Sequence, residues 1–321
     1  MAGSRSVVLA ALFANGAIAI LKFIGFLLTA SPSMLSETYH SISDTGNQVF
    51  LLIGIRYGKR EADREHPFGY GKAQFFYSFV VSVLLFGIAG WESAKHGFNQ
   101  LTSGGHGGGG HGTIEFLGFV YEPSFGFDPV LVNYTVLLLG IAFETYAFKK
   151  AYAEMSRQME ANDWATLREA FRKTSDVTTL TALTEDTIAL GGLVLALVGI
   201  FLTQQTGIEA FDQAAALLIG IMLMGFALAL AWENKRLILG ESLPADDERE
   251  LRDVVADWEG VARVVDFRTV YFGPERVVVT ADVEFAPGFE GAEIDEAISA
   301  MEDALKETHT GVRTVYIEPE V

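Results

Sequence analysis

The sequence predicts a membrane protein in which an all-α bundle of six transmembrane helices precedes a small α+β domain. Half of the 321 residues are hydrophobic, and they are clustered rather than dispersed. Six apolar stretches are long enough to cross a hydrocarbon core, which takes about 20 helical residues. The remaining C-terminal stretch is polar and acidic, and it changes to the shorter periodic patterns of a soluble domain.

The six predicted spans lie near residues 7–29, 33–57, 73–95, 129–150, 178–203 and 209–233. The first apolar run is too long for the core of a signal peptide and has no clear small-residue cleavage site. We therefore expect it to remain in the mature protein as the first helix.

Positively charged residues predict the orientation of these spans. The connection after the second span is rich in Lys and Arg, and so is the connection after the fourth. Residues 97–128 and 204–208 contain neither. Because cytoplasmic loops carry the excess of Lys and Arg, we expect both termini to be cytoplasmic. The predicted location is the plasma membrane of a prokaryote.

Two domains follow from this division, a six-helix transmembrane domain over 1–240 and a cytoplasmic domain over 241–321. The second is predicted to run helix–strand–strand–helix–strand, with Gly273–Pro274 as the turn between its first two strands. Its predicted elements are 246–257, 261–272, 276–285, 292–307 and 312–317. Two helices against three strands predict a ferredoxin-like αββαβ layer.

Composition excludes several classes of function. There is no cysteine, which removes disulfides, thiolate metal sites and cysteine nucleophiles together. The net charge is −18, and residues 241–321 hold 21 acids against 7 Lys and Arg. Such an acidic domain repels nucleic acid, so we expect no nucleic-acid partner.

The second span carries a polar stripe inside its apolar sequence. His40 and Asp44 are four residues apart and therefore lie on one face of a helix, as does Asn47 near the same stripe. Ionisable groups at membrane depth cost several kcal/mol, so they predict a functional site. An imidazole and a carboxylate are ligands for Zn²⁺ and related ions. The alternative is a hydrogen-bonded stripe that joins neighbouring helices.

The fifth span supplies further acids at Glu185 and Asp186. Adjacent residues differ by about 100° around a helix, so the two cannot face one ion in the same way. We favour Asp186 as the ligand and Glu185 as a supporting group, proton carrier or partner of a cation. The alternative is an ion pair. Lys22 on the first span either pairs with a buried carboxylate or reaches the outer interface.

Two loops also hold possible ligands. In ADREHPFGYGK (62–72), Asp63 and His66 are candidate metal ligands, and the alternative is a loop that docks to the next helix. The low-complexity segment SGGHGGGGHG (103–112) is predicted to be a flexible linker, with weak metal capture as the alternative.

The stretch SETYHSISDTGNQVFLLIGIRYGKREADREHPFGYGKAQFFYSFVVS (36–82) resembles the cation diffusion facilitator family. Together with LTEDTIALGG in the fifth span, it is most similar to the zinc-transporter-nine-like branch. The resemblance covers nearly the whole chain. It implies a homodimeric exporter of divalent metal ions that exchanges them for protons, and it implies no enzymatic activity.

The resemblance also implies a transport site with two ligands from the second span and two from the fifth. His40, Asp44 and Asp186 match three of these positions, but Ala182 stands at the fourth. Candidate replacements are Glu185, Asn15, Asn47 and water. An oxygen-rich set of ligands favours Mn²⁺ or Fe²⁺ over Zn²⁺. Zn²⁺ is the first expectation, with Mn²⁺, Fe²⁺, Co²⁺ and Cd²⁺ as alternatives.

The resulting hypothesis is proton-coupled antiport of a divalent metal by alternating access, because metal and protons compete for the same ligands. The expected partners are divalent metal ions, protons, the lipid bilayer and a second copy of the chain. Two alternatives come from other classes: a metal-regulated membrane scaffold that does not transport, and a membrane metal-dependent hydrolase.

Overall fold

The computed structural model describes residues 2–102, 114–116, 119–121, 128–161, 164–173, 177–274, 276–289 and 291–320. The glycine- and histidine-rich segment 103–112, predicted to be a flexible linker, therefore lies outside the described residues. The chain divides into two compact units, Met1–Phe50 with Val80–Ala231 and Leu51–Phe79 with Trp232–Val321. We call them the helical unit and the tail unit, and each is described by itself.

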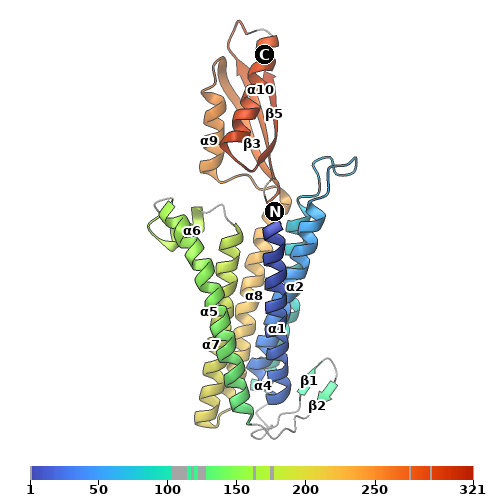
Figure 1. The fold of residues 1–321 in the computed structure, drawn as a ribbon, viewed down its shortest axis with the longest axis vertical. Helices are drawn as coiled ribbons and strands as arrows, with labels where there is room; N and C mark the ends of the chain where they lie inside the picture. The colour runs from blue at the N-terminus through green and yellow to red at the C-terminus, as the bar shows by residue number, and fades with distance from the viewer. Residues whose placement is uncertain are drawn as a thin grey trace. The chain divides into compact units, whose positions relative to one another are not determined.

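Helices cover all six predicted spans in the described part of the chain, and they run side by side in the helical unit (Figure 1). Their bounds are α1 Ala2–Thr29, α2 Pro32–Gly58, α3 Ala73–Leu84, α4 Trp91–Thr102, α5 Pro129–Ala161, α7 Val177–Thr206 and α8 Ala210–Leu239. A π-helical turn, η1 (Leu85–Gly90), joins α3 to α4 without a break, since Leu84 and Trp91 on either side keep right-handed helical dihedrals.

Three short elements were not predicted from the sequence. A two-stranded antiparallel hairpin pairs β1 (Ile114–Phe116) with β2 (Phe119–Tyr121). A short helix, α6 (Leu167–Lys173), follows α5.

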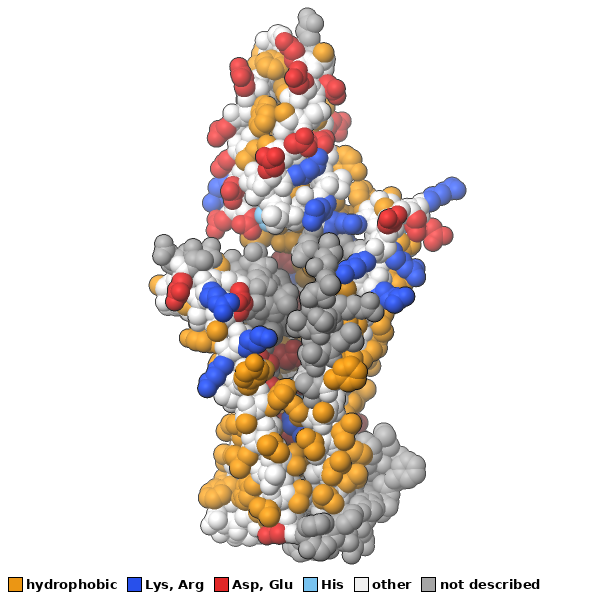
Figure 2. All heavy atoms as spheres, in the orientation of Figure 1, with side chains coloured by type: hydrophobic (Ala, Val, Ile, Leu, Met, Phe, Trp, Pro, Cys, Tyr) orange, Lys and Arg blue, Asp and Glu red, His pale blue; other side chains and the backbone are white. Residues whose placement is uncertain are grey.

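Four of the described helical stretches are both long and apolar enough to cross a membrane: Ala73–Thr102, Val130–Glu160, Leu183–Thr206 and Ala210–Leu239. Asn15–Thr29 is apolar but shorter. Helix α2 does not qualify, because polar residues interrupt its apolar sequence. Hydrophobic side chains cover the outside of the helices (Figure 2), and Leu131 and Trp232 are 67% and 63% exposed. Such a surface suits lipid rather than water.

The core of the helical unit joins five helices. Phe26, Met34, Leu137, Leu193 and Leu223 belong to one buried cluster and come from α1, α2, α5, α7 and α8 in that order. Helix α4 meets α8 at Gly220, where an added Cβ would lie 2.3 Å from the backbone nitrogen of Ala94. Small residues allow such backbone contact between membrane helices.

The tail unit contains the predicted order helix–strand–strand–helix–strand. Its elements are α9 Ala245–Ala256, β3 Val261–Gly273, β4 Arg276–Phe285, α10 Gly291–Thr308 and β5 Val312–Glu320. Strand β4 is central, antiparallel to β3 with Val270 opposite Val278, and parallel to β5 with Val279 opposite Val315. Helix α10 makes the crossover that a parallel pair requires.

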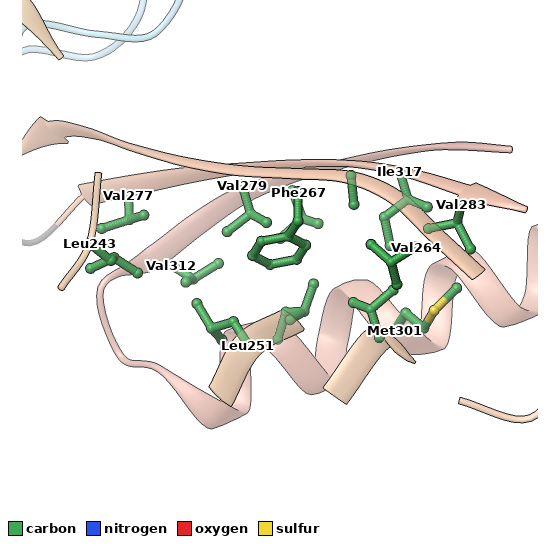
Figure 3. Close-up of a cluster of buried hydrophobic side chains, with 14 residues drawn as sticks. Leu243, Leu251, Val264, Phe267, Val277, Val279, Val283, Met301, Val312 and Ile317 are labelled. Atoms are coloured by element: carbon green, nitrogen blue, oxygen red, sulfur yellow. The ribbon is translucent and has the colours of Figure 1, made fainter. Parts of the chain in front are cut away.

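Helices α9 and α10 cover one face of this sheet and enclose its core (Figure 3). Leu251 of α9 and Met301 of α10 are fully buried against Val279 and Val283 of the central strand. The alternating pattern along β3 and β5 places apolar side chains on the covered face. These helices and strands therefore have a hydrophobic core of their own.

Candidate metal centre

The first half of α2 is polar and yet buried, which is the unusual feature of the helical unit. Seven of its polar residues, or residues directly before it, are buried: Ser31, Ser33, Ser36, Glu37, Thr38, His40 and Ser41. Some of the hydroxyl groups bind within the helix, as when Thr38 Oγ1 donates to the carbonyl of Met34 at 2.8 Å. The carboxylate and the imidazole need partners from elsewhere.

Asp212 of α8 fixes the beginning of α2. Its Oδ2 accepts a 2.7 Å hydrogen bond from Ser31 Oγ, and its Oδ1 accepts one of 3.3 Å from the backbone nitrogen of Ser33. A carboxylate at a helix N-terminus satisfies free amides and favours the helix dipole. Asp212 thus caps a neighbouring helix.

His40 and Asp44 lie beside each other one turn apart, as their spacing predicts. His40 Nε2 is 3.5 Å from Asp44 Oδ2, and the two side chains are 2% and 14% exposed. Neither ring nitrogen of His40 has a hydrogen-bond partner among the described residues. A buried imidazole in this state needs an explanation, and the role of a metal ligand is one.

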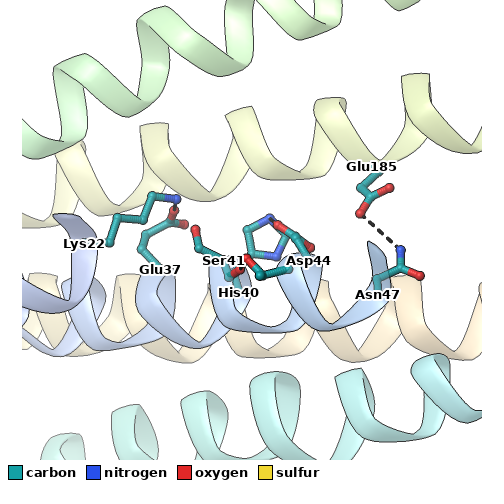
Figure 4. Close-up of polar contacts among 8 residues, drawn as sticks. Lys22, Glu37, His40, Ser41, Asp44, Asn47 and Glu185 are labelled. Atoms are coloured by element: carbon teal, nitrogen blue, oxygen red, sulfur yellow. Dashed lines mark hydrogen bonds and ion pairs between the residues drawn. The ribbon is translucent and has the colours of Figure 1, made fainter. Parts of the chain in front are cut away.

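Helix α7 brings Glu185 and Asp186 to the same region. Asn47 Nδ2 of α2 donates to Glu185 Oε1 at 3.5 Å, so the stripe on α2 reaches α7 directly. Asp44 interacts electrostatically with Asp186, and both Glu185 and Asp186 are half-buried. Figure 4 shows His40, Ser41 and Asp44 between the Lys22–Glu37 pair and the Asn47–Glu185 contact.

The predicted ligands are neighbours but do not close around a single point. Among the described residues, no three His, Asp or Glu side chains are arranged closely enough to hold a metal ion. Asn15 is half-buried on α1, and in the described part of the chain no hydrogen bond links it to the predicted ligands. The side chain of Ala182 lies outside the described residues, although its backbone belongs to α7.

Two acids of this region, Glu144 and Glu37, were not among the predicted ligands. Glu144 of α5 interacts electrostatically with Asp44, Glu185 and Asp186. Glu37 binds Lys22, with Nζ 2.8 Å from Oε2 and both side chains buried. Of the two interpretations of Lys22 from the sequence, this contact supports pairing with a buried carboxylate and not extension to the outer interface. The available signal for Glu144 was an acid within an apolar run.

The other predicted ligands, Asp63 and His66, lie in the tail unit. Asp63 Oδ1 is 3.7 Å from His66 Nδ1, and both side chains are about half exposed. Asp63 Oδ2 accepts a 2.6 Å hydrogen bond from Tyr70, which lowers the pKa of Asp63 and raises that of Tyr70 to about 12. Backbone amides of Glu65 and His66 donate to Asp63 Oδ1.

The same loop packs onto the β3–β4 hairpin of the tail unit. Arg276 Nη1 donates to the carbonyl of Phe68 at 3.1 Å, and the rings of Phe68 and Phe272 are 4.8 Å apart. At Gly71 an added Cβ would lie 2.2 Å from the carbonyl oxygen of Phe272. The loop thus contacts the hairpin, whereas the alternative interpretation of the sequence was docking to the next helix.

Comparison with known proteins adds the family. Residues 8–239 match the model of the cation efflux transmembrane domain, and residues 243–320 match that of the cation efflux protein cytoplasmic domain. The matched family consists of transporters and not of enzymes. Together with the apolar helices, the match makes this an integral membrane protein.

Individual relatives are similar over most of this chain. The mitochondrial proton-coupled zinc antiporter SLC30A9 of Mus musculus is 26% identical over 88% of this chain and 46% of its own length. Metal tolerance protein C4 of Arabidopsis thaliana is 24% identical over 88% of this chain and 57% of its own length. The cation-efflux pump FieF of Yersinia pestis (strain Pestoides F) is 26% identical over 81% of this chain and 74% of its own length.

The chain thus spans about half the length of the mitochondrial antiporters that it matches. The matches confirm the predicted resemblance, including that to the zinc-transporter-nine-like branch. With both domain models covering it almost from end to end, the chain belongs to the cation efflux, or cation diffusion facilitator, family.

Proposed function

We propose that this protein exports a divalent metal ion across a membrane. The observation that carries the proposal is the buried His40–Asp44 pair, whose imidazole has no hydrogen-bond partner among the described residues, in a chain of the cation efflux family. Related proteins bear names of a zinc antiporter, a metal tolerance protein and a cation-efflux pump. Zn²⁺ is the proposed cargo, with Mn²⁺, Fe²⁺, Co²⁺ and Cd²⁺ as alternatives.

The proposed ligands are His40, Asp44 and Asp186, which come from α2 and α7. Because they do not converge in this conformation, binding requires a small approach of α7 to α2 or the rotation of side chains. Glu185, Asn47, Asn15 or water supplies the fourth ligand where Ala182 offers none. Oxygen ligands at that corner weaken the preference for Zn²⁺.

The proposed mechanism is alternating access coupled to protons. A metal ion needs a neutral imidazole and ionised carboxylates, so protons and metal exclude each other from the same atoms. Protons that enter from the outer side displace the ion and return the carrier to its inward-open state. Glu144 and Glu185, which interact electrostatically with Asp44, are additional proton carriers in this scheme.

The proposed architecture has six spans, with α2 and α1 added to the four apolar stretches, and both termini in the cytoplasm. A transport domain over 1–240 precedes a ferredoxin-like domain over 241–321, through which two copies form a homodimer. The match to a cytoplasmic domain supports the placement of the second domain. The proposed location is a prokaryotic plasma membrane. Asp63 and His66 are proposed to hold an interfacial metal ion.

The test is transport in proteoliposomes that contain the purified full-length protein and a metal-sensitive dye. Zn²⁺ flux is expected to rise with an imposed pH gradient, and Asp44→Ala and Asp186→Ala are expected to abolish it. Flux that ignores the pH gradient removes proton coupling from the proposal. Unchanged flux in both variants removes the proposed site, and metal binding without any flux in the wild type indicates the scaffold alternative.

A further inference from the structure

The proposed transport site has a buried ion pair beside it that the proposed mechanism does not use. Lys22 of α1 and Glu37 of α2 are 1% and 0% exposed, and Nζ lies 2.8 Å from Oε2. Glu37 precedes His40 by three residues, so the two side chains share a face of α2 (Figure 4). The pair is therefore a neighbour of the proposed ligands and not one of them.

Two glycines on other helices enclose the pair. At Gly192 of α7 an added Cβ would lie 2.5 Å from Glu37 Oε1. At Gly140 of α5 an added Cβ would lie 3.7 Å from Lys22 Cε. Glu37 Oε1 is buried and has no hydrogen-bond partner among the described residues. The position of the pair is thus determined by α1, α2, α5 and α7 together.

Lys22 is the one Lys or Arg that is buried in the described part of the chain. Its charge also acts on groups other than Glu37, since it interacts electrostatically with His40, Asp44 and Glu144. Glu37 in turn interacts with His40, Asp44 and Glu144. Each member of the pair therefore contributes to the electrostatic potential at the proposed ligands, with opposite sign.

A contribution to folding stability is a weak explanation for the presence of a buried ion pair. Desolvation of two buried charges offsets most of their attraction, and apolar residues of similar volume often replace them without loss. The same low-dielectric surroundings make each charge act strongly on a nearby ion. The effect on a cation is consequently the larger physical consequence of the pair.

We propose that the Lys22–Glu37 pair sets the affinity of the transport site for its divalent cation from outside the set of ligands. The inference rests on the proposed function, because it needs a cation at His40, Asp44 and Asp186. Lys22 repels the cation and weakens its binding, and Glu37 does the reverse. Their near-cancellation keeps the affinity moderate, so that an exporter can release what it binds.

The test measures Zn²⁺ binding to the purified full-length protein by calorimetry. A unit charge about 10 Å from a divalent ion changes its binding constant by about a hundredfold at an effective dielectric constant of about 20. Lys22→Met is therefore expected to tighten binding by about tenfold or more, and Glu37→Gln to weaken it by about tenfold or more. The double variant is expected to bind within about threefold of the wild type.

A structural role gives a different pattern. If the pair only holds the helices together, both single variants lower the melting temperature and weaken binding together, and that result overturns the proposal. Equal affinity in all variants overturns it as well. Should a single variant fail to fold, the exchanged pair Lys22→Glu with Glu37→Lys keeps the charges matched. The exchange moves the positive charge of the lysine to position 37, one turn from His40. Weaker Zn²⁺ binding is therefore expected, and unchanged binding contradicts the proposal.

Asp44→Ala separates this inference from the proposed function. If Asp44→Ala loses Zn²⁺ binding but the Lys22 and Glu37 variants do not shift the affinity in opposite directions, the proposed transport site stands. The role of the pair in setting the affinity is then refuted. Zn²⁺ binding that survives Asp44→Ala refutes the proposed site itself.

Discussion

Tyr70 donates a 2.6 Å hydrogen bond to Asp63, the residue that sequence analysis had marked as a metal ligand. The other oxygen of Asp63 accepts hydrogen bonds from two backbone amides. The ring of His66 lies against that of Tyr70, with centroids 4.1 Å apart. Both oxygens of Asp63 therefore already accept hydrogen bonds from this loop, and a metal ion at Asp63 competes with these donors.

The first prediction concerns the titration of Tyr70. Its pKa is raised to about 12 by the bond to Asp63, so the phenol is expected to ionise later than an ordinary tyrosine, near 10. The pKa of Tyr70 is higher in the folded than in the unfolded chain. The hydrogen bond to Asp63 therefore contributes fully to the free energy of unfolding below pH about 10, and this contribution is lost as pH rises through about 12. The difference between the ultraviolet absorbance titrations of the wild type and of Tyr70→Phe gives the ionisation of this one tyrosine.

Asp63 gives the complementary prediction at low pH. Its pKa is lowered, first by the bond from Tyr70, so its contribution is present above the ordinary pKa of an aspartate and is lost as pH falls through the folded value. Tyr70→Phe is expected to move the Asp63 titration upwards, as followed by carboxyl NMR signals. An unchanged titration means that Tyr70 does not hold Asp63 in solution.

The second prediction tests the contact between the loop and the hairpin. Gly71→Ala is expected to destabilise the tail unit by about 1–3 kcal/mol, because the new methyl group meets the backbone carbonyl of Phe272. Gly291→Ala is the matched control, since nothing lies within 4 Å of its added Cβ. Thermal unfolding of the full chain measures both, and equal effects would show that the close approach is absent.

The third prediction uses two adjacent glycines on α7. Gly192→Ala is expected to lower stability by about 1 kcal/mol or more, because its methyl group overlaps Glu37 Oε1 in the buried pair. Gly191→Ala makes only ordinary contact, 3.5 Å from Met222 Sδ, and gains helix propensity of up to about 1 kcal/mol. Opposite signs in thermal unfolding are expected, and a stabilising Gly192→Ala would contradict the packing described.

The fourth prediction concerns the missing ligand. Ala182→His places an imidazole four residues before Asp186, which repeats the His40–Asp44 spacing on the other helix. A second imidazole is expected to tighten Zn²⁺ binding by about tenfold or more and to raise its preference over Mn²⁺. Ala182→Phe controls for size. Equal Zn²⁺ to Mn²⁺ ratios in the two variants would mean that position 182 does not face the ion.

Much of the fold was predictable because it rests on local patterns. Helices over all six apolar stretches, and the αββαβ order after residue 241, follow from hydrophobic length and periodicity. The turn η1, the hairpin of β1 and β2 and helix α6 are too short to leave such a pattern. The assignment of Leu51–Phe79 to the tail unit depends on contacts between distant segments, which no single sequence displays.

The candidate site also contains contacts that local spacing predicts and contacts that depend on the packing of distant segments. The pairing of His40 with Asp44 follows from helical spacing alone, and it is present at 3.5 Å. The contacts Asn47–Glu185 and Ser31–Asp212 join residues 138 and 181 positions apart, so only the packing of helices reveals them. Glu144 was not predicted as part of the site, because its surroundings come from α2 and α7 and not from its neighbours in sequence.

The buried polar half of α2 also constrains how the protein is made. A helix with Glu37, His40 and Asp44 on one face partitions poorly into lipid by itself. During synthesis α1 emerges first and offers Lys22 at once, whereas Asp212 and Glu185 arrive only when α7 and α8 have been translated. Until then α2 needs shelter in the translocation channel or beside water. For the proposed six-span architecture, the insertion of α2 into the membrane is therefore expected to be a late step that follows the synthesis of α7 and α8.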